Sequence, residues 1–548
     1  MTRPDNQQWE FGPFRLDGAQ YLLFRDGKVV PLSRKATDVL LVLLEHHGQL
    51  VEKEVLMRRV WPDSFVEESN LAVHISQLRK ILSEDAGPCR IETIPRRGYR
   101  FIGELNREAA PEAAPIILPQ TPPAAAPTRW PLSPAIAAVA LFAIAFLALY
   151  LHHRAIVAAR RATDLRAQTI QRERFAKEAH QYQFVTGDLI RAAPIYENWA
   201  AAFPGDIVPR TNLALIDSDL GKFGPSLDHG RAALRMAPGD SRNYDSLASH
   251  YIASDSLNEA RAVIDRAVAR NLDSPGLHLD LYDIAFLQRD DAGMARQMAW
   301  AAGNPALEGP FLEHYANTLA FVGKDAQAAA FTGRAADAAR RANAKETAAG
   351  CKLDAAQHEA LFGNPADAKR LAGDALALAH DRDTIYGAAL VLALAGAVAP
   401  ANAIVDQLNH DFPDDTFVQY LYLPTIRAAV ALQQKDPVRA ERALEVSIPY
   451  ELGVAGGLVP VYVRGLAFLA SNDSPRAEAE FQKVIANPGV VLNSPIGPLS
   501  RLQLARAYAL EGDRTHAKAA YQDFLTRWKD ADPNLPILRA AKAEYAKQ

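Results

Sequence analysis

Cysteine is nearly absent from this sequence, and its net charge is close to zero. The 548 residues contain two cysteines, Cys89 and Cys351. Two thiols cannot build a disulfide scaffold or a zinc site made only of cysteine thiolates. Lysine and arginine number 60 against 64 aspartates and glutamates, which gives a formal net charge of −4. A chain so close to neutral has no bulk attraction for nucleic acid, so any such binding must come from a local basic patch.

Common enzyme motifs are also missing. The sequence has no glycine-rich phosphate loop, no G-x-S-x-G elbow, no H-E-x-x-H zinc motif and no kinase signature. We therefore expect no enzyme activity, no cofactor and no metal site. An enzyme hidden in the C-terminal part would need convergent titratable residues, of which the sequence gives no sign. Residues 1–10 are polar, so we expect no secretory signal.

One long apolar run does occur. It covers residues 131–151, PLSPAIAAVALFAIAFLALYL, and holds no charged residue. At ~1.5 Å of rise per residue, a helix of this length reaches about 31 Å, the hydrocarbon thickness of a bilayer. The run therefore predicts a single transmembrane helix. A buried helix of a globular domain is the alternative.

The first 106 residues mix strand and helix patterns in a definite order. Alternation of apolar residues predicts strands, and apolar residues at three- and four-residue spacing predict helices. The predicted elements are a strand over 9–16, strand pattern over 21–30 interrupted by the tight-turn dipeptide Asp26-Gly27, helices over 33–48, 52–60 and 67–82, and a β-hairpin over 91–105. A small sheet, three helices and a basic hairpin are the element order of a winged helix.

Three strings in this region carry a family resemblance. They are LSRKATDVLLVLLEHHGQLVEKEVLMRRVWPD, NLAVHISQLRKIL and IETIPRRGYRFIG. They resemble the OmpR/PhoB-type winged-helix DNA-binding domain, over roughly residues 9–105. The string TIPRRGY is similar to the wing of the CadC/ToxR-type membrane-embedded regulators. Since the first strand begins at residue 9, we expect no phosphorylatable receiver domain before it.

The resemblance implies that the helix over 67–82 reads the major groove of DNA. Its apolar positions face the core: Leu71, Ile75, Leu78 and Leu82. Its other face offers polar groups and cations for bases and phosphates: Asn70, His74, Ser76, Gln77, Arg79 and Lys80. By resemblance, Ser76 and Gln77 match base-facing positions. His74 and Arg79 match phosphate-contacting positions. Many relatives carry arginine near Ser76 and Gln77, so its absence predicts a different operator or weaker direct readout.

The predicted hairpin supplies further cations. Arg96 and Arg97 at its tip can enter the minor groove, where the potential is strongly negative. Gly98 would let the tip turn. From Arg79 to Arg100 the sequence has six basic residues and three acidic ones, so positive charge gathers where docking needs it. The alternative is that these are solvated charges without a role in binding.

Residues 152–548 are rich in alanine and almost entirely helical in pattern. Pro204-Gly205-Asp206 recurs as Pro238-Gly239-Asp240, 34 residues later, which is the period of the tetratricopeptide repeat. The clearest units are Leu247, Ala248, Tyr251, Ala260, Ile264 and Ala267; Gly465, Phe468, Ala477, Phe481, Val484 and Pro488; and Leu504, Ala505, Tyr508, Gly512, Ala517 and Tyr521. The region resembles a degenerate tetratricopeptide array with a concave surface. No register can be assigned over 275–345.

The predicted fold class is multidomain: an N-terminal α+β winged helix-turn-helix, a single transmembrane helix and a C-terminal all-α tetratricopeptide-like solenoid. The predicted boundaries are 1–106 for the DNA-binding domain, 107–130 for an Ala/Pro-rich linker, 131–151 for the span, 152–182 for a charged helical connector and 183–548 for the repeats. The connector is either simply solvated or coiled with a second copy.

Membrane orientation brings a conflict. DNA binding requires a cytoplasmic N-terminal domain, which would place the repeats in the periplasm, beyond the inner membrane. Positively charged residues should then precede the span. Only Arg129 lies close before it, apart from Arg107 and Glu108, whereas four arginines follow it: Arg154, Arg160, Arg161 and Arg166. If the apolar run does not span a membrane, the whole chain is a soluble cytoplasmic regulator.

These patterns lead to two functional hypotheses. The first is a membrane-anchored one-component transcriptional regulator, which binds double-stranded promoter DNA, by resemblance as a homodimer. Its repeat domain would sense a ligand or a protein or peptide partner. The alternative is a tetratricopeptide scaffold that assembles an envelope complex, with the winged helix as an interaction module. Duplex binding by residues 1–106 distinguishes the two.

Overall fold

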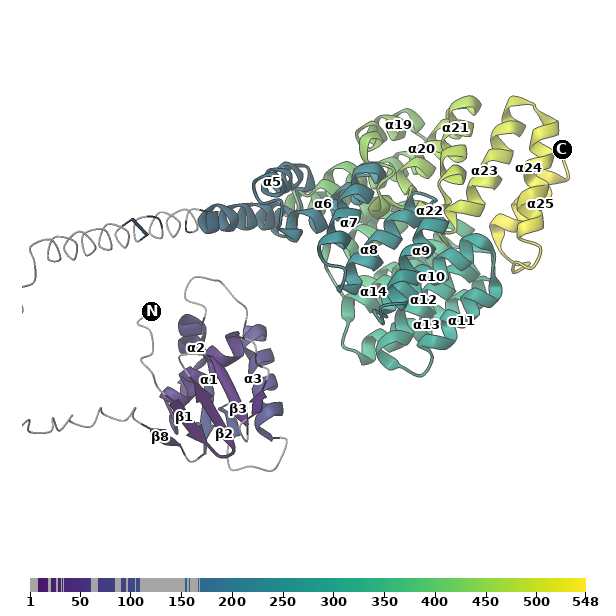
Figure 1. Cartoon of the computed structure of the whole chain (residues 1–548). Coiled ribbons are helices and arrows are strands. Elements are labelled where there is room, and N and C mark those ends of the chain that lie inside the picture. The colour runs from purple at the N-terminus through teal and green to yellow at the C-terminus, as the bar shows by residue number, and fades with distance from the viewer. Residues whose placement is uncertain are drawn as a thin grey trace, which may run out of the picture. The chain divides into compact units, whose positions relative to one another are not determined.

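The chain forms two compact units, Met1–Leu141 and Phe142–Gln548 (Figure 1). The structure is a computed structural model. It describes residues 8–17, 21–25, 28–30, 32, 34–60, 68–83, 90–94, 97–103, 105–108, 153, 154, 157, 166 and 168–548. Each unit has its own buried apolar cluster, so each is described by itself.

The N-terminal unit begins with an antiparallel sheet. Its strands are β1 (Gln8–Phe11), β2 (Phe14–Asp17), β3 (Leu22–Arg25), β4 (Lys28–Val30) and β8 (Asn106–Glu108), in the order β4-β3-β2-β1-β8. Trp9 pairs with Leu16, and Phe11 pairs with Phe14. The single strand predicted over 9–16 is therefore wrong, because the chain turns at Gly12, whose φ is 54°. Positive φ is a conformation that glycine adopts without steric cost.

Three helices and a second sheet complete this unit. They are α1 (Arg34–Glu45), α2 (Lys53–Val60) and α3 (Glu68–Ser83), with β5 (Val51–Glu52), β6 (Arg90–Ile94) and β7 (Gly98–Ile102) in the order β5-β7-β6. The predicted helices and the predicted hairpin are confirmed in position. The Lys35 ammonium donates to the Val60 carbonyl over 2.5 Å, so it satisfies a backbone group at the end of α2.

The second unit is a helical repeat array. Its first half contains η1 (Gln181–Thr186), α5 (Leu189–Ala202), α6 (Ile207–Asp219), α7 (Phe223–Met236), α8 (Ser241–Ala253), α9 (Leu257–Val268), α10 (Pro275–Gln288), α11 (Asp291–Ala301), α12 (Pro305–Phe321), α13 (Asp325–Arg341), α14 (Lys345–Phe362) and α15 (Pro365–Leu376). Its second half contains α16 (Arg382–Leu394), α17 (Val398–Asp411), η2 (Val418–Tyr422), α18 (Leu423–Gln433), α19 (Pro437–Leu444), η3 (Glu445–Tyr450), η4 (Val454–Gly456), α20 (Val459–Ala470), α21 (Ser474–Ala486), α22 (Pro488–Val491), α23 (Ile496–Glu511), α24 (Arg514–Arg527) and α25 (Pro536–Tyr545).

Small residues let the paired helices pack closely, as the repeat pattern predicts. A Cβ placed on Gly465 of α20 would lie 2.6 Å from the Phe481 ring of α21. The buried residues Leu247 and Ala248 of α8 and Ala260 and Ile264 of α9 form one such pair. Helices α10 to α13 cover the stretch over 275–345 to which no register could be assigned from the sequence. Tetratricopeptide-like helical repeats therefore run through this unit.

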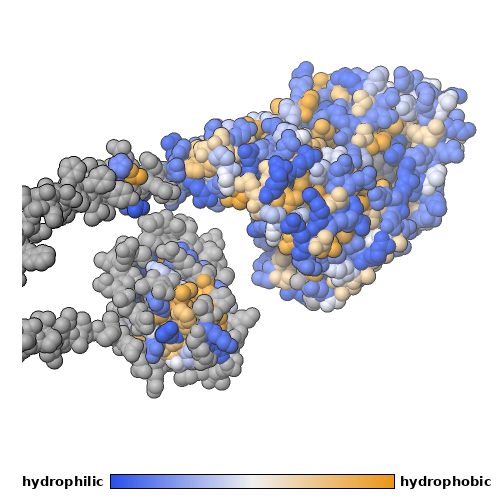
Figure 2. Space-filling model, viewed as in Figure 1, coloured by the Kyte–Doolittle hydropathy of each residue, from blue (hydrophilic) through white to orange (hydrophobic). Residues whose placement is uncertain are grey.

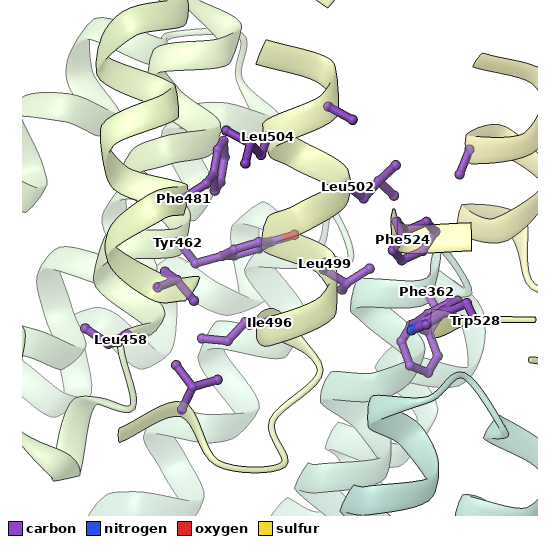
Figure 3. Close-up of a cluster of buried hydrophobic side chains, with 14 of the residues drawn as sticks. Phe362, Leu458, Tyr462, Phe481, Ile496, Leu499, Leu502, Leu504, Phe524 and Trp528 are labelled. Carbon is purple, nitrogen blue, oxygen red and sulfur yellow. The ribbon is translucent and has the colours of Figure 1, made fainter. Parts of the chain in front are cut away.

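The array folds back on itself, so that its second half lies against its first (Figure 1). The Gly489 amide in α22 donates to Asp255 after α8 over 2.9 Å. The Trp528 indole donates to the Phe321 carbonyl at the end of α12 over 3.0 Å. Figure 3 shows Trp528 beside Phe362 of α14, with their ring centroids 5.4 Å apart. These contacts join residues far apart in sequence, so the array does not form an open superhelix with a fully exposed concave face.

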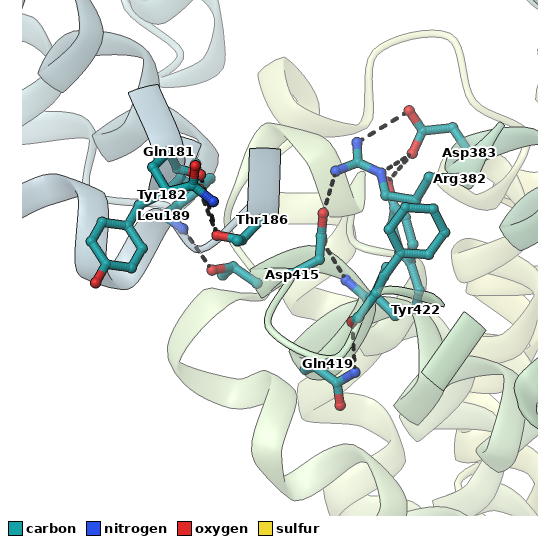
Figure 4. A network of polar contacts seen from close by, with 12 residues as sticks. Gln181, Tyr182, Thr186, Leu189, Arg382, Asp383, Asp415, Gln419 and Tyr422 are labelled. Atoms are coloured by element: carbon teal, nitrogen blue, oxygen red, sulfur yellow. Dashed lines mark hydrogen bonds and ion pairs between the residues drawn. The ribbon is translucent and has the colours of Figure 1, made fainter. Parts of the chain in front are cut away.

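Polar contacts join η1 and α5 to the second half in the same way (Figure 4). The Leu189 amide donates to the Thr416 hydroxyl over 2.9 Å. The Thr416 amide donates to the carbonyl of Gly187, which ends η1, over 3.0 Å. Within the second half, Arg382 forms an ion pair with the buried Asp415 at 2.7 Å, next to Thr416. The surface of this unit is mainly hydrophilic with scattered apolar spots, as Figure 2 shows. Scattered apolar side chains are ordinary for a folded surface.

The predicted fold class and localisation need correction on one point. Among the residues that the structure describes, no helix is both long and apolar enough to cross a membrane. The apolar run over 131–151 lies outside the described residues. Over the described residues, the observed architecture is a small winged helix and a large all-helical repeat solenoid, and no described helix provides the predicted span. The predicted placement in the inner membrane, with the repeats in the periplasm, depended on that helix and is withdrawn.

Candidate nucleic-acid interface

Helix α3 has one buried side and one polar side. Leu71, Ile75, Leu78 and Leu82 are each at most 3% exposed and belong to the core of the N-terminal unit. Their spacing of three and four residues places them on one face of the helix. Of the described positions between them, Ile81 also packs against the core, whereas Ser76 is exposed.

The structure places the predicted DNA-contacting residues of α3 as follows. Ser76 is exposed, while His74, Gln77 and Arg79 are half-buried. Asn70 and Lys80 belong to the helix, but their side chains lie outside the described residues. An exposed hydroxyl next to a half-exposed amide gives the helix hydrogen-bonding groups suited to base edges.

Arg79 connects α3 to the hairpin. Its Nε donates to the Ile91 carbonyl over 2.9 Å, and one terminal nitrogen donates to the Thr93 hydroxyl over 2.5 Å. Both partners belong to β6. Two hydrogen bonds from one planar guanidinium fix the distance and the angle between helix and hairpin. Arg79 was predicted as a phosphate contact from the resemblance alone. The structure shows that it holds α3 and β6 together, the two elements that are predicted to contact DNA.

The hairpin tip is itself anchored to the rest of the unit. The Arg97 amide donates to the Ile94 carbonyl over 3.1 Å, and the Lys53 amide at the start of α2 donates to the Arg97 carbonyl over 3.2 Å. The Arg97 side chain is exposed. Arg96 lies outside the described residues.

Gly98 is required for a reason that the sequence did not reveal. Its Cβ position lies 2.0 Å from the carbonyl oxygen of Val51 on β5. Any side chain here would push β7 away from β5, to which it pairs through Glu52. Gly98 thus serves the close approach of two strands, whereas the sequence predicted that it lets the tip turn.

Charge near the hairpin is only partly neutralised. Arg100 and Glu92 face each other across the two strands with 3.9 Å between nitrogen and oxygen, and both are more than a third exposed. Such an exposed pair contributes ~0–1 kcal/mol. Arg97 forms no ion pair with any described residue, so its charge is available to a polyanion. An exposed helix face and a cationic hairpin, held together by Arg79, form a surface that can seat against duplex DNA.

Comparison with known proteins supports a transcriptional-regulator domain in the N-terminal unit. Residues 27–101 match the family described as "Transcriptional regulatory protein, C terminal". The transcriptional regulator HilA of Salmonella typhimurium is 38% identical over 130 residues, which cover 23% of this chain and 21% of HilA. The transcriptional activator CadC of Escherichia coli K12 is 30% identical over 101 residues, 18% of this chain and 20% of CadC. The chain thus spans about a fifth of the length of these relatives.

These matches confirm the OmpR/PhoB-type domain and leave the repeats uncovered. The crystal structure of yeast Tom70 aligns with 69% of this chain and 95% of that chain, at 12% identity and a TM-score of 0.33. A TM-score this low does not establish a shared fold. The description of the repeats rests on their own helices and contacts.

Proposed function

We propose that this chain is a transcriptional regulator. Its winged helix, residues 1–106, binds promoter DNA, and its helical repeats, residues 183–548, receive a signal by binding a ligand or a protein partner. The observation that carries the proposal is the union of two features in one domain. The domain matches a family of transcriptional regulatory proteins, and Arg79 holds its polar helix face and its cationic hairpin together.

In this proposal each predicted residue has a distinct role. Ser76 and Gln77 contact base edges in the major groove. His74, Asn70 and Lys80 contact the phosphates beside that groove, and Arg79 positions the hairpin. Arg96 and Arg97 enter the adjacent minor groove. Two copies bind two half-sites, in agreement with the resemblance stated above.

The proposal can be tested with a variant of the hairpin. We expect Arg96→Ala with Arg97→Ala to weaken duplex binding by about tenfold and to lower the slope of log affinity against log salt by about 1 to 2. The reason is that a protein with two fewer cations at the DNA releases fewer counterions when it binds. Fluorescence anisotropy of the full chain with duplexes selected from a random pool measures both quantities.

The matched control is Lys28→Ala, which removes an exposed cation from β4 in the other sheet of the same unit. It should leave the slope unchanged. If the hairpin variant keeps the wild-type slope while remaining folded, the hairpin is not part of the interface. If the folded wild-type chain binds no duplex at low salt, the winged helix is instead an interaction module of a repeat scaffold.

A further inference from the structure

A cavity of about 540 Å³ lies where the two halves of the repeat array face each other. Helices α10, α11 and α12 contribute one wall, and α21, α23 and α24 contribute the other. Cavities of ~300–1,000 Å³ are the size that holds small organic ligands. Because the array folds back on itself, this space belongs to neither half alone.

Apolar side chains form much of the cavity surface. Phe286 and Phe321 meet edge to face with ring centroids 5.1 Å apart. Met294, Val322 and Ile485 line the space beside them. All five are only partly buried, although their helices are well packed. An aliphatic chain placed here would remove this apolar surface from water, which is favourable.

Cations gather at the same cavity. Its lining contains Arg289, Arg501, Arg527 and Lys529. Arg501 and Arg527 share one carboxylate, Asp523, at 3.4 Å and 3.0 Å. Arg289 and Lys529 form no ion pair with a described residue. Burial, followed by the neighbouring charges of Arg527 and Arg289, lowers the pKa of Arg501.

These cations outnumber the nearby carboxylates. Asp291 in the lining and Asp523 behind it are two negative charges against four positive ones. A neighbouring cavity of about 860 Å³, which shares Leu492 with this one, has the opposite character and contains five aspartates and one arginine. The two cavities therefore differ in the type of ionisable side chain that lines them.

We propose that the cavity between the two halves binds an aliphatic monocarboxylate, with its chain against Phe286, Met294 and Phe321 and its carboxylate beside Arg289 and Arg501. An inorganic anion would leave the apolar walls in contact with water. A neutral lipid would leave the cations unpaired. A carboxylate pairs these cations, because it accepts charge-assisted hydrogen bonds from arginine. This proposal names the class of ligand that the repeat domain binds. The signalling role of that ligand rests on the regulator function proposed above.

The test uses the full chain and dodecanoate, measured by isothermal titration calorimetry below the micelle concentration and without DNA. We expect one saturable site. Dodecanol and dodecyltrimethylammonium should bind at least tenfold more weakly. Arg289→Gln combined with Lys529→Gln should weaken dodecanoate binding at least tenfold, and so should Met294→Trp, which fills the cavity.

The matched controls are Arg266→Gln on α9 and Lys518→Gln on α24, two exposed cations outside the cavity. They should bind dodecanoate like the wild type. Because Arg289 and Lys529 are exposed and unpaired, their variant should melt like the wild type, which keeps the test valid if Met294→Trp fails to fold.

Unsaturable binding, equal binding of dodecanol, or unchanged affinity in the Arg289 and Lys529 variant would each overturn the proposal. Binding of a peptide ending in leucine, without binding of dodecanoate, would also overturn it. Since no DNA is present, these outcomes are independent of whether the winged helix binds a duplex.

Discussion

Single residues decide how the winged helix is held together. Arg79 donates two hydrogen bonds to residues of β6, and Gly98 leaves room for the Val51 carbonyl. The sequence identified both positions but not these roles. Arg79 precedes its partners Ile91 and Thr93 by 12 and 14 residues, and no local pattern connects a helix residue to a particular strand residue. Only the packed structure shows the connection.

The close approach at Gly98 makes a stability prediction. Gly98→Ala places a methyl group where the Val51 carbonyl oxygen lies, so β5 and β7 must separate. We expect the free energy of unfolding to fall by about 1–3 kcal/mol, the usual range for overpacking. Thermal melting of a fragment covering residues 1–108, followed by circular dichroism, measures the change. An unchanged midpoint would mean that the two strands do not approach in this way.

Asp280 is a second residue whose environment is unusual. It lies in the acidic cavity, is 6% exposed and accepts a hydrogen bond from Ser249 over 3.0 Å. Burial, and then the charge of Asp245, raises the pKa of Asp280 well above its ordinary value. The folded state therefore holds a proton that the unfolded state releases near pH 4. Its contribution to stability is fully present below that pH and is lost as the pH rises through the folded-state pKa.

This residue predicts a pH dependence. Asp280→Asn should raise the free energy of unfolding at pH 8 by at least about 1.4 kcal/mol, the equivalent of one pKa unit, and should change it less at pH 5. Urea unfolding of the full chain, followed by circular dichroism, reports mainly on the helical repeats. Asp406→Asn on α17 removes an exposed aspartate and serves as the control. A gain that is equal at both pH values would contradict the assignment.

At the scale of elements, regular patterns were predicted and irregular ones were not. The helices α2 and α3 follow clear apolar periodicity, and each of their observed ends lies within one residue of the predicted end. The turn at Gly12 was missed although the apolar positions shift there from 9 and 11 to 14 and 16, and although Gly12-Pro13 is a turn dipeptide. No register could be assigned to helix α10 from the sequence because the helix is buried on several sides, with Asp280, Tyr282 and Ala285 all inside. A helix without a single exposed side carries no amphipathic stripe.

The contact between α22 and α8 provides a prediction at this scale. A Cβ on Gly489 would lie 1.9 Å from the Ile252 carbonyl oxygen. Gly489→Ala should therefore force α22 away from α8 and lower the free energy of unfolding by about 1–3 kcal/mol, measured by urea unfolding of the full chain.

The matched control is Gly373→Ala in α15, where nothing lies within 4 Å of the new methyl group. Alanine is the better helix former, so this control should stabilise the chain by up to about 1 kcal/mol. If both variants behave alike, α22 is not held against α8.

For the molecule as a whole, the sequence predicted the two kinds of unit but not the closure of the array. The repeat pattern is local, so it reveals helix pairs. Closure depends on pairs such as Asp255 with Gly489 and Phe321 with Trp528, which lie 234 and 207 residues apart. No short sequence window contains both partners. Closure replaces the open concave surface, expected from the repeats, with two neighbouring cavities, one lined by several aspartates and the other by several cations.

The apolar run over 131–151 led to a prediction that the described residues do not support. Its length and composition alone suggested a membrane span, and the predicted localisation followed from it. No described helix provides such a span. The functional proposal is therefore built on the winged helix and the repeats, and it requires no membrane.

The most direct test of the central claim is hydrogen exchange of the full chain with and without a selected DNA duplex. The account predicts slower amide exchange in α3 and in the hairpin over residues 90–102 when DNA is bound, while exchange in β4 stays unchanged. If the duplex binds but protects neither α3 nor the hairpin, this surface is not the one that reads DNA.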